Sequence, residues 1–195
     1  MLTAIKYNLA HLADFRGRDA RSTFWFYVLF LILVQFAVSM AVSIPMTGSM
    51  MGEVYSSVRS GASDAEMQRR IFTHVNSMMR ASLWTSSALS LAMAALLVAA
   101  FTRRLHDSNK PGWIAVAVAI IQVLLIIQTI SYMDEVVNMT VLMQSGDLAS
   151  AKAIQSSLAA KGLLGWIPAL ALIVFGAWPS TPGDNKYGPP PPPPA

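Results

Sequence analysis

The chain has 195 residues, of which 54% are hydrophobic and 12% are charged, and its formal net charge is +4. Soluble domains carry about 25% charged residues, so this composition and a mean hydropathy of +0.50 exclude an ordinary soluble globule and indicate a single-domain membrane protein. The absence of cysteine excludes disulfides, thiolate metal sites and cysteine nucleophiles.

The first fifteen residues are predicted to form an amphipathic helix. Leu2, Ile5, Leu9 and Leu12 recur at helical spacing and form one apolar stripe. Such a helix either lies in the membrane interface or packs against the protein's own helices, and the pattern is compatible with both. Three arginines follow it in the segment 16–23.

Four apolar runs have the length of a membrane span. A bilayer core of about 30 Å needs about 20 helical residues. The predicted spans are 24–44, 83–101, 113–130 and 163–178. Aromatic residues at the start of the first span suit the headgroup level, and Pro45 and Gly48 are expected to mark its far end. Pro168 is expected to kink the last span.

The two polar segments between spans, 45–82 and 131–162, carry helical patterns of their own. Ser63 and Glu66 have the spacing of a capping box, which predicts a helix that runs directly into the second span. We therefore expect an all-α, integral membrane four-helix bundle with an amphipathic N-terminal helix and helical extensions on its outer face.

The orientation follows from the placement of lysine and arginine. Basic residues are denser in 1–23, 102–112 and 179–195 than in the two longer polar segments. Both termini are therefore expected in the cytoplasm. The membrane domain is predicted to cover 1–178, and the Pro-rich residues 179–195 to form a flexible cytoplasmic tail.

The polar run from Phe101 to Trp113 is predicted to be a hinge between the second and third spans. Arg103 and Arg104 would complement the negative end of the second helix and face anionic headgroups. Asp107 is expected to accept hydrogen bonds from arginines of the segment 16–23.

Three segments together resemble the domain-of-unknown-function family 805 of small bacterial inner-membrane proteins. They are Phe15-Arg-Gly-Arg-Asp-Ala-Arg-Ser-Thr-Phe-Trp25, Arg103-Arg-Leu-His-Asp107 with Gly112-Trp113, and Pro182-Gly-Asp-Asn-Lys-Tyr-Gly188. The resemblance implies a multi-pass protein of the bacterial inner, or plasma, membrane, and the family offers no established activity.

These motifs define a candidate polar cluster on the cytoplasmic face. Its role is either structural, fixing helix ends and orientation, or functional, binding an anionic lipid headgroup, another phosphate or a partner protein. The candidate residues are Arg18, Arg21, Arg103, Arg104, His106, Asp107, Asn185 and Tyr187.

The sequence contains none of the common catalytic motifs, so we expect no enzyme activity, no cofactor and no metal site. The predicted function is a non-enzymatic membrane interaction or scaffold protein, or a protein that senses lipid headgroups. The alternative is a small transporter or channel component that acts as an oligomer. The expected partners are membrane lipids, possible anionic headgroups among them, a second copy or another membrane protein, and no nucleic acid. The spans carry no Asp, Glu, Lys, Arg or His, the groups that ion pathways usually need. Gln35, Gln122 and Gln128 are expected to bond across helices.

Overall fold

The computed structural model describes residues 1–191, and this part of the chain is built from helices without a strand. The helices are α1 (Leu2–Ala10), α2 (Arg21–Arg59), α3 (Asp64–Asp107), α4 (Trp113–Ser131), α5 (Met133–Ser145), α6 (Leu148–Leu163) and α7 (Trp166–Ala177). The predicted all-α fold is confirmed. The end of the predicted tail, 192–195, lies outside the described residues.

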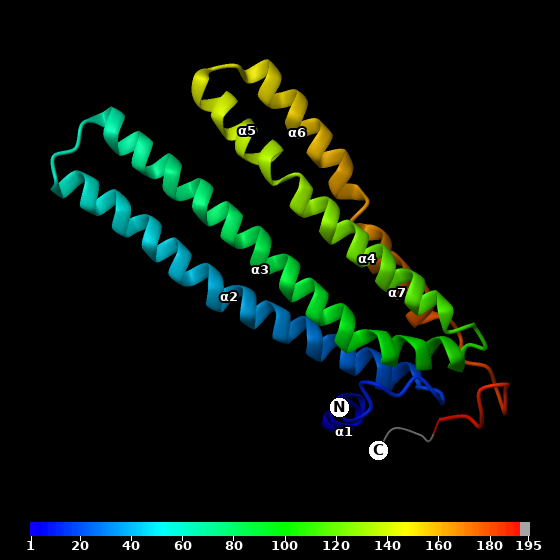
Figure 1. The fold of residues 1–195 in the computed structure, drawn as a ribbon. Coiled ribbons are helices and arrows are strands. Elements are labelled where there is room, and N and C mark those ends of the chain that lie inside the picture. The colour runs from blue at the N-terminus through cyan, green and yellow to red at the C-terminus, as the bar shows by residue number, and fades with distance from the viewer. Residues whose placement is uncertain (192–195) are drawn as a thin grey trace.

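The long helices form two pairs that meet at one end and diverge toward the other (Figure 1). The closed end holds residues 1–23, 101–113 and 178–191, and we call it the termini end. The open end holds 45–82 and 131–162, and we call it the hairpin end. Within residues 1–191, four segments are long and apolar enough to cross a membrane, namely α2, α3, α4 with α5, and α6 with α7. The chain is therefore a multi-pass membrane bundle.

Helix α2 is longer than the first predicted span. It runs without interruption through Pro45 and Gly48 to Arg59. The helix therefore continues past the predicted end of the span, which stays a prediction. Proline costs one backbone hydrogen bond and crowds the preceding turn. Helix α2 packs along the neighbouring α3.

Helix α3 begins with the predicted capping box. The Glu66 backbone N–H donates to Ser63 Oγ at 3.3 Å, and the Ser63 N–H donates to Glu66 Oε2 at 3.2 Å. The helix continues into the second span, as predicted, and ends at Asp107 rather than near Phe101. The predicted hinge is therefore mostly helix, and only residues 108–112 connect α3 to α4.

The fourth span is interrupted between α6 and α7 at Leu164 and Gly165. Pro168 is the third residue of α7, where its missing N–H would have no partner within the helix. A proline disrupts the turn that precedes it, at the residue four positions earlier. Leu164 is that residue, so the break agrees with the predicted kink at Pro168.

Helix α1 packs on the protein with a face that coincides only in part with the predicted apolar stripe. Ala4, Ile5 and Asn8 are buried, whereas Leu2 and Leu9 are 73% and 43% exposed. Of the predicted stripe, Ile5 is buried and Leu12 packs against the apolar core, whereas Leu2 and Leu9 point away from the protein. Asn8 turns inward because its side chain has a buried charged partner, described below.

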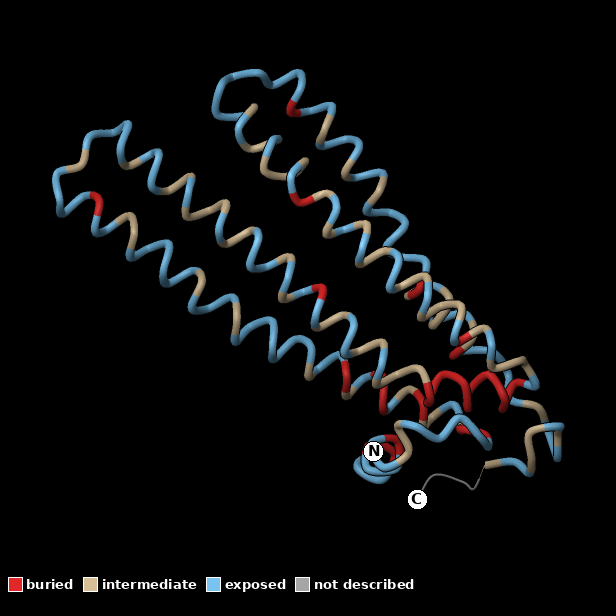
Figure 2. Tube along the Cα trace, viewed as in Figure 1, coloured by how far each residue is buried: buried red, intermediate tan, exposed pale blue. Residues whose placement is uncertain are grey.

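Burial is concentrated at the termini end, as Figure 2 shows in red along the last turns of α3. The apolar core joins Phe24 and Tyr27 of α2 to Phe101 and Leu105 of α3. The rings of Phe24 and Phe101 stack with centroids 6.0 Å apart. This core supports a polar layer immediately beyond it.

Candidate functional site

The last turns of α3 bury a polar cluster at the termini end. Arg103, Arg104 and Asp107 have no exposed surface, and Arg18 and Asp19 are 6% and 1% exposed. Burying a charged side chain without a partner costs on the order of several kcal/mol per ion. The chain therefore brings other segments to these side chains.

Arg103 fixes α1 and the loop that follows it. Its Nε donates to Asp19 Oδ2 at 3.0 Å, and its Nη2 donates to Asn8 Oδ1 at 2.6 Å. Its Nη1 donates to the carbonyl oxygens of His11, at 2.9 Å, and Asp14. His11 caps the C-terminus of α1, so the guanidinium also binds the negative end of that helix.

Arg104 binds the C-terminal end of α7 as Arg103 binds that of α1. Its Nε donates to the Gly176 carbonyl at 2.9 Å, and its Nη2 donates to the Trp178 carbonyl. Its Nη1 donates to Asp107 Oδ2 at 2.6 Å. The arginine therefore holds the C-terminal end of the fourth span against α3.

Arg18 joins this layer to the tail. Its Nη2 and Nε donate to Asp107 Oδ1 at 3.0 and 3.1 Å. The Nη groups also donate to the carbonyl oxygens of Thr181 and Gly183, each at 2.7 Å, and of Gly188 at 3.2 Å. Asp107 is therefore shared by two arginines, and the segment 181–188 wraps around one of them.

His106 provides the second attachment of the tail. Its ring stacks on Tyr187 with centroids 3.7 Å apart and an interplanar angle of 10°. The Asn185 side-chain amide donates to the His106 carbonyl at 2.9 Å, and His106 Nδ1 lies 3.2 Å from the Gly17 carbonyl oxygen. A Cβ added to Gly112 would lie 2.8 Å from His106 Nε2, so this glycine of the second motif makes room for the ring.

The structure thus brings together seven of the eight predicted cluster residues. Arg21 is the exception, because it is exposed and its closest acceptor is the Trp178 carbonyl, at 3.5 Å. The expectation that Arg103 and Arg104 face headgroups is wrong, since both guanidiniums are buried and bind protein acceptors. Each caps a helix other than its own.

Sequence reasoning missed two members of the cluster, Asn8 and Asp19. Asp19 lies inside the first motif, directly after Arg18, and its charge was the available signal. Burial raises the pKa of the Asp19 carboxyl, and the Arg103 guanidinium opposes that rise. Asn8 offered no such signal, because it lies off the leucine stripe from which the helix was predicted.

The excess of positive charge in the cluster explains why the arginines also bind backbone carbonyls. Three guanidiniums meet two carboxylates, and the carbonyls at the ends of α1 and α7 supply further negative partial charge. This arrangement orients and joins helices. Among the described residues, no group of three or more His, Asp or Glu side chains is placed to hold a metal ion.

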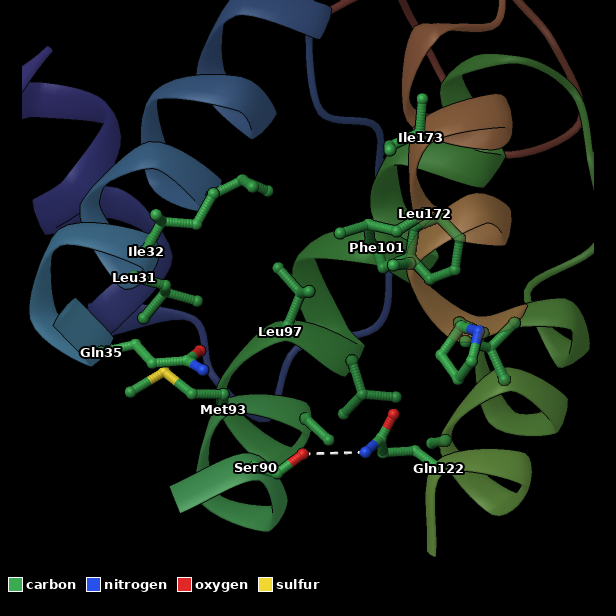
Figure 3. A pocket seen from close by; sticks show the side chains of 18 of the residues that line it. Leu31, Ile32, Gln35, Ser90, Met93, Leu97, Phe101, Gln122, Leu172 and Ile173 are labelled. Carbon is green, nitrogen blue, oxygen red and sulfur yellow. Dashed lines mark hydrogen bonds between the residues drawn. The ribbon is translucent and has the colours of Figure 1, made fainter. Parts of the chain in front are cut away.

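A separate apolar cavity lies deeper in the bundle, between α2, α3, α4 and α7 (Figure 3). Its volume is about 460 Å³, and its polar lining consists of Gln35, Ser90 and Gln122. Gln122 Nε2 donates to Ser90 Oγ at 2.8 Å, which confirms the predicted bond between helices. Gln128 instead donates to Tyr132, one turn further along the chain, so the prediction is wrong there.

Comparisons with known proteins agree with the motifs in this cluster. Neither the curated proteins nor the solved structures gave a match. The family described as "Protein of unknown function (DUF805)" matches residues 12–189, which include α2 to α7 and the tail motif. The chain therefore belongs to the DUF805 family.

Proposed function

We propose that this protein is a non-enzymatic interaction protein of the bacterial inner membrane that binds anionic lipid headgroups at its cytoplasmic, termini end. The observation that carries the proposal is the outer face of α1. Leu2, Lys6 and Leu9 lie on that face, all three exposed, while the opposite face is buried. An apolar pair beside a lysine suits a helix lying in the headgroup region.

The cations that serve this function are the exposed ones. Lys6, Arg16 and Arg21 lie at the termini end with exposed side chains. Arg103 is unsuited to lipid binding, because its donors hold α1 in place. It acts as a positioning residue that fixes the orientation of the lipid-binding helix.

The test compares two charge reversals of equal size at opposite ends of the molecule. Lys6→Glu with Arg16→Glu and Arg21→Glu changes the termini end, and Arg59→Glu with Arg69→Glu and Arg70→Glu is the matched control at the hairpin end. Each protein is purified from micelles containing phosphatidylglycerol and phosphatidylcholine, and the retained lipids are measured by mass spectrometry. A basic residue near an anionic surface contributes about 1 kcal/mol, so the first variant should lose phosphatidylglycerol enrichment by about tenfold or more.

Equal enrichment in the first variant and the unmodified protein would overturn the proposal. So would an equal loss in both variants, because the loss would then follow net charge alone. Topology is checked in each variant by labelling an Asp184→Cys substitution, at an exposed residue of the termini end, from either side of the membrane. A variant with inverted topology would be replaced by Leu2→Ser with Leu9→Ser, with Leu148→Ser at the hairpin end as its control.

The cavity between the helix pairs supports lipid contact better than solute passage. Its lining is almost entirely apolar, and two of its three polar side chains, Ser90 and Gln122, bond to each other. Such a surface suits a lipid acyl chain. The transporter alternative therefore has no specific observation in its favour.

A further inference from the structure

Methionine is concentrated at the hairpin end. The chain has twelve methionines and no cysteine, so thioethers are its only soft ligand atoms. Nine of the twelve lie in the hairpin-end segments: Met46, Met50, Met51, Met67, Met78, Met79, Met133, Met139 and Met143. The lipid proposal uses none of these residues.

Four of these methionines face one hollow between α2 and α3. Met46 and Met50 come from successive turns of α2, and Met78 and Met79 come from α3. The hollow has a volume of about 410 Å³. Met50 is 37% exposed and the other three are half-buried, so the hollow is both accessible and partly shielded.

One sulfur is already oriented by a polar group. Ser82 Oγ donates to Met46 Sδ at 3.6 Å, and Ser82 also lines the hollow. The sulfur of Met133, in contrast, accepts from Arg80 Nη1 at 3.6 Å and lies outside this lining. The hollow therefore gathers a distinct subset of the methionines of the hairpin end.

We propose that Met46, Met50, Met78 and Met79 form a binding site for a soft monovalent cation, Cu(I) or Ag(I). Thioethers are soft, neutral ligands that select Cu(I) over hard cations. The methionine side chain is unbranched and has three rotatable bonds, so four thioethers around one hollow can converge on an ion. Thioethers need no deprotonation, in contrast to histidine or thiol ligands, so binding is expected to be insensitive to pH.

The other use of methionine is as an adaptable packing residue. Leucine has a similar volume and packs equally well, but it has no sulfur. A methionine-to-leucine series therefore separates the two roles. Packing alone predicts no change in metal affinity, whereas the proposed site predicts its loss.

The experiment titrates the full-length protein in detergent with Ag(I), followed by native mass spectrometry, and with Cu(I) against a colorimetric chelator. The unmodified protein should bind one ion with the same affinity at pH 5.5 and 7.5. Met46→Leu with Met50→Leu, Met78→Leu and Met79→Leu should weaken binding at least about a hundredfold. The control changes four methionines of the hairpin end outside the hollow: Met51→Leu, Met67→Leu, Met139→Leu and Met143→Leu. It should keep the affinity.

Three results would overturn the proposal. The first is an unmodified protein that binds neither ion. The second is equal affinity in the hollow variant and the control variant. The third is binding that is lost at pH 5.5 and abolished by His74→Ala, which would assign the ion to the imidazole. Thermal denaturation of each variant shows whether it is folded, and Met46→Leu with Met50→Leu replaces the fourfold variant if that one unfolds.

Discussion

Asp107 accepts two hydrogen bonds from Arg18, a residue 89 positions earlier in the chain, at 3.0 and 3.1 Å. The same carboxylate accepts from Arg104 at 2.6 Å. Through these two arginines it connects α3 to the loop before α2, to the end of α7 and to the tail. A single buried carboxylate thus joins segments from both ends of the sequence.

Asp107→Asn should therefore destabilise the bundle strongly. The amide keeps the shape of the side chain but leaves two buried guanidiniums with less negative charge, and breaking a buried ion pair costs about 3–5 kcal/mol. We expect a clearly lower midpoint of thermal denaturation in detergent. The matched control is Asp134→Asn, whose carboxylate is 91% exposed and pairs with Arg80. An exposed pair contributes little, so equal effects of the two changes would contradict the role given to Asp107.

Arg103→Lys should release α1 while leaving the bundle assembled. A lysine carries a single ammonium group and cannot reach Asn8, Asp19 and the His11 carbonyl together. We expect amide hydrogen exchange in residues 2–10 to accelerate by about tenfold or more. Arg21→Lys is the control, since Arg21 is exposed. Unchanged exchange in α1 would show that its apolar contacts suffice to hold it.

Features that depend on neighbouring residues could be predicted from the sequence, whereas features that depend on long-range contacts could not. The capping box at Ser63 and Glu66 needs only a four-residue spacing, so it could be predicted and is present. The apolar spans are equally local. The extension of α3 to Asp107 could not be predicted in this way, because the polar last turns bind partners from α1, α7 and the tail, which are distant in the sequence.

The candidate site could likewise be predicted only in part. Motif residues could be gathered at one end of the molecule from topology alone, and seven of them are in contact there. Their burial could not be predicted, because most acceptors of Arg18 and Arg104 are backbone carbonyls, which every residue type carries. The burial of Asn8 could not be predicted for a related reason, since side-chain apolarity says nothing of the Asn8–Arg103 bond.

Gly176→Ala should destabilise the contact between α7 and α2. An added Cβ would lie 2.7 Å from Phe24 Cε1 and 3.1 Å from Trp25 Cζ2, both of them atoms of bulky rings. Overpacking of this kind costs about 1–3 kcal/mol. Gly162→Ala in α6 is the control, since its Cβ would meet nothing within 4 Å, and alanine favours a helix by about 0.5–1 kcal/mol. Thermal denaturation should therefore shift in opposite directions for the two alanines, and a shift in the same direction would contradict the close approach at Gly176.

Asn185→Ala combined with Tyr187→Ala should detach the tail from His106. The change removes a ring stacked at 3.7 Å and an amide bonded to the His106 carbonyl at 2.9 Å. A hydrogen bond contributes about 1 kcal/mol and an aromatic pair about 0.5–1.5 kcal/mol, so proteolysis within 179–191 should accelerate by about tenfold or more. Asp184→Ala, at an exposed neighbour, should leave the rate unchanged. If the double variant resists proteolysis as well as the unmodified protein does, the three carbonyl contacts of Arg18 hold the tail unaided, and His106 serves only to fill the space beside Gly112.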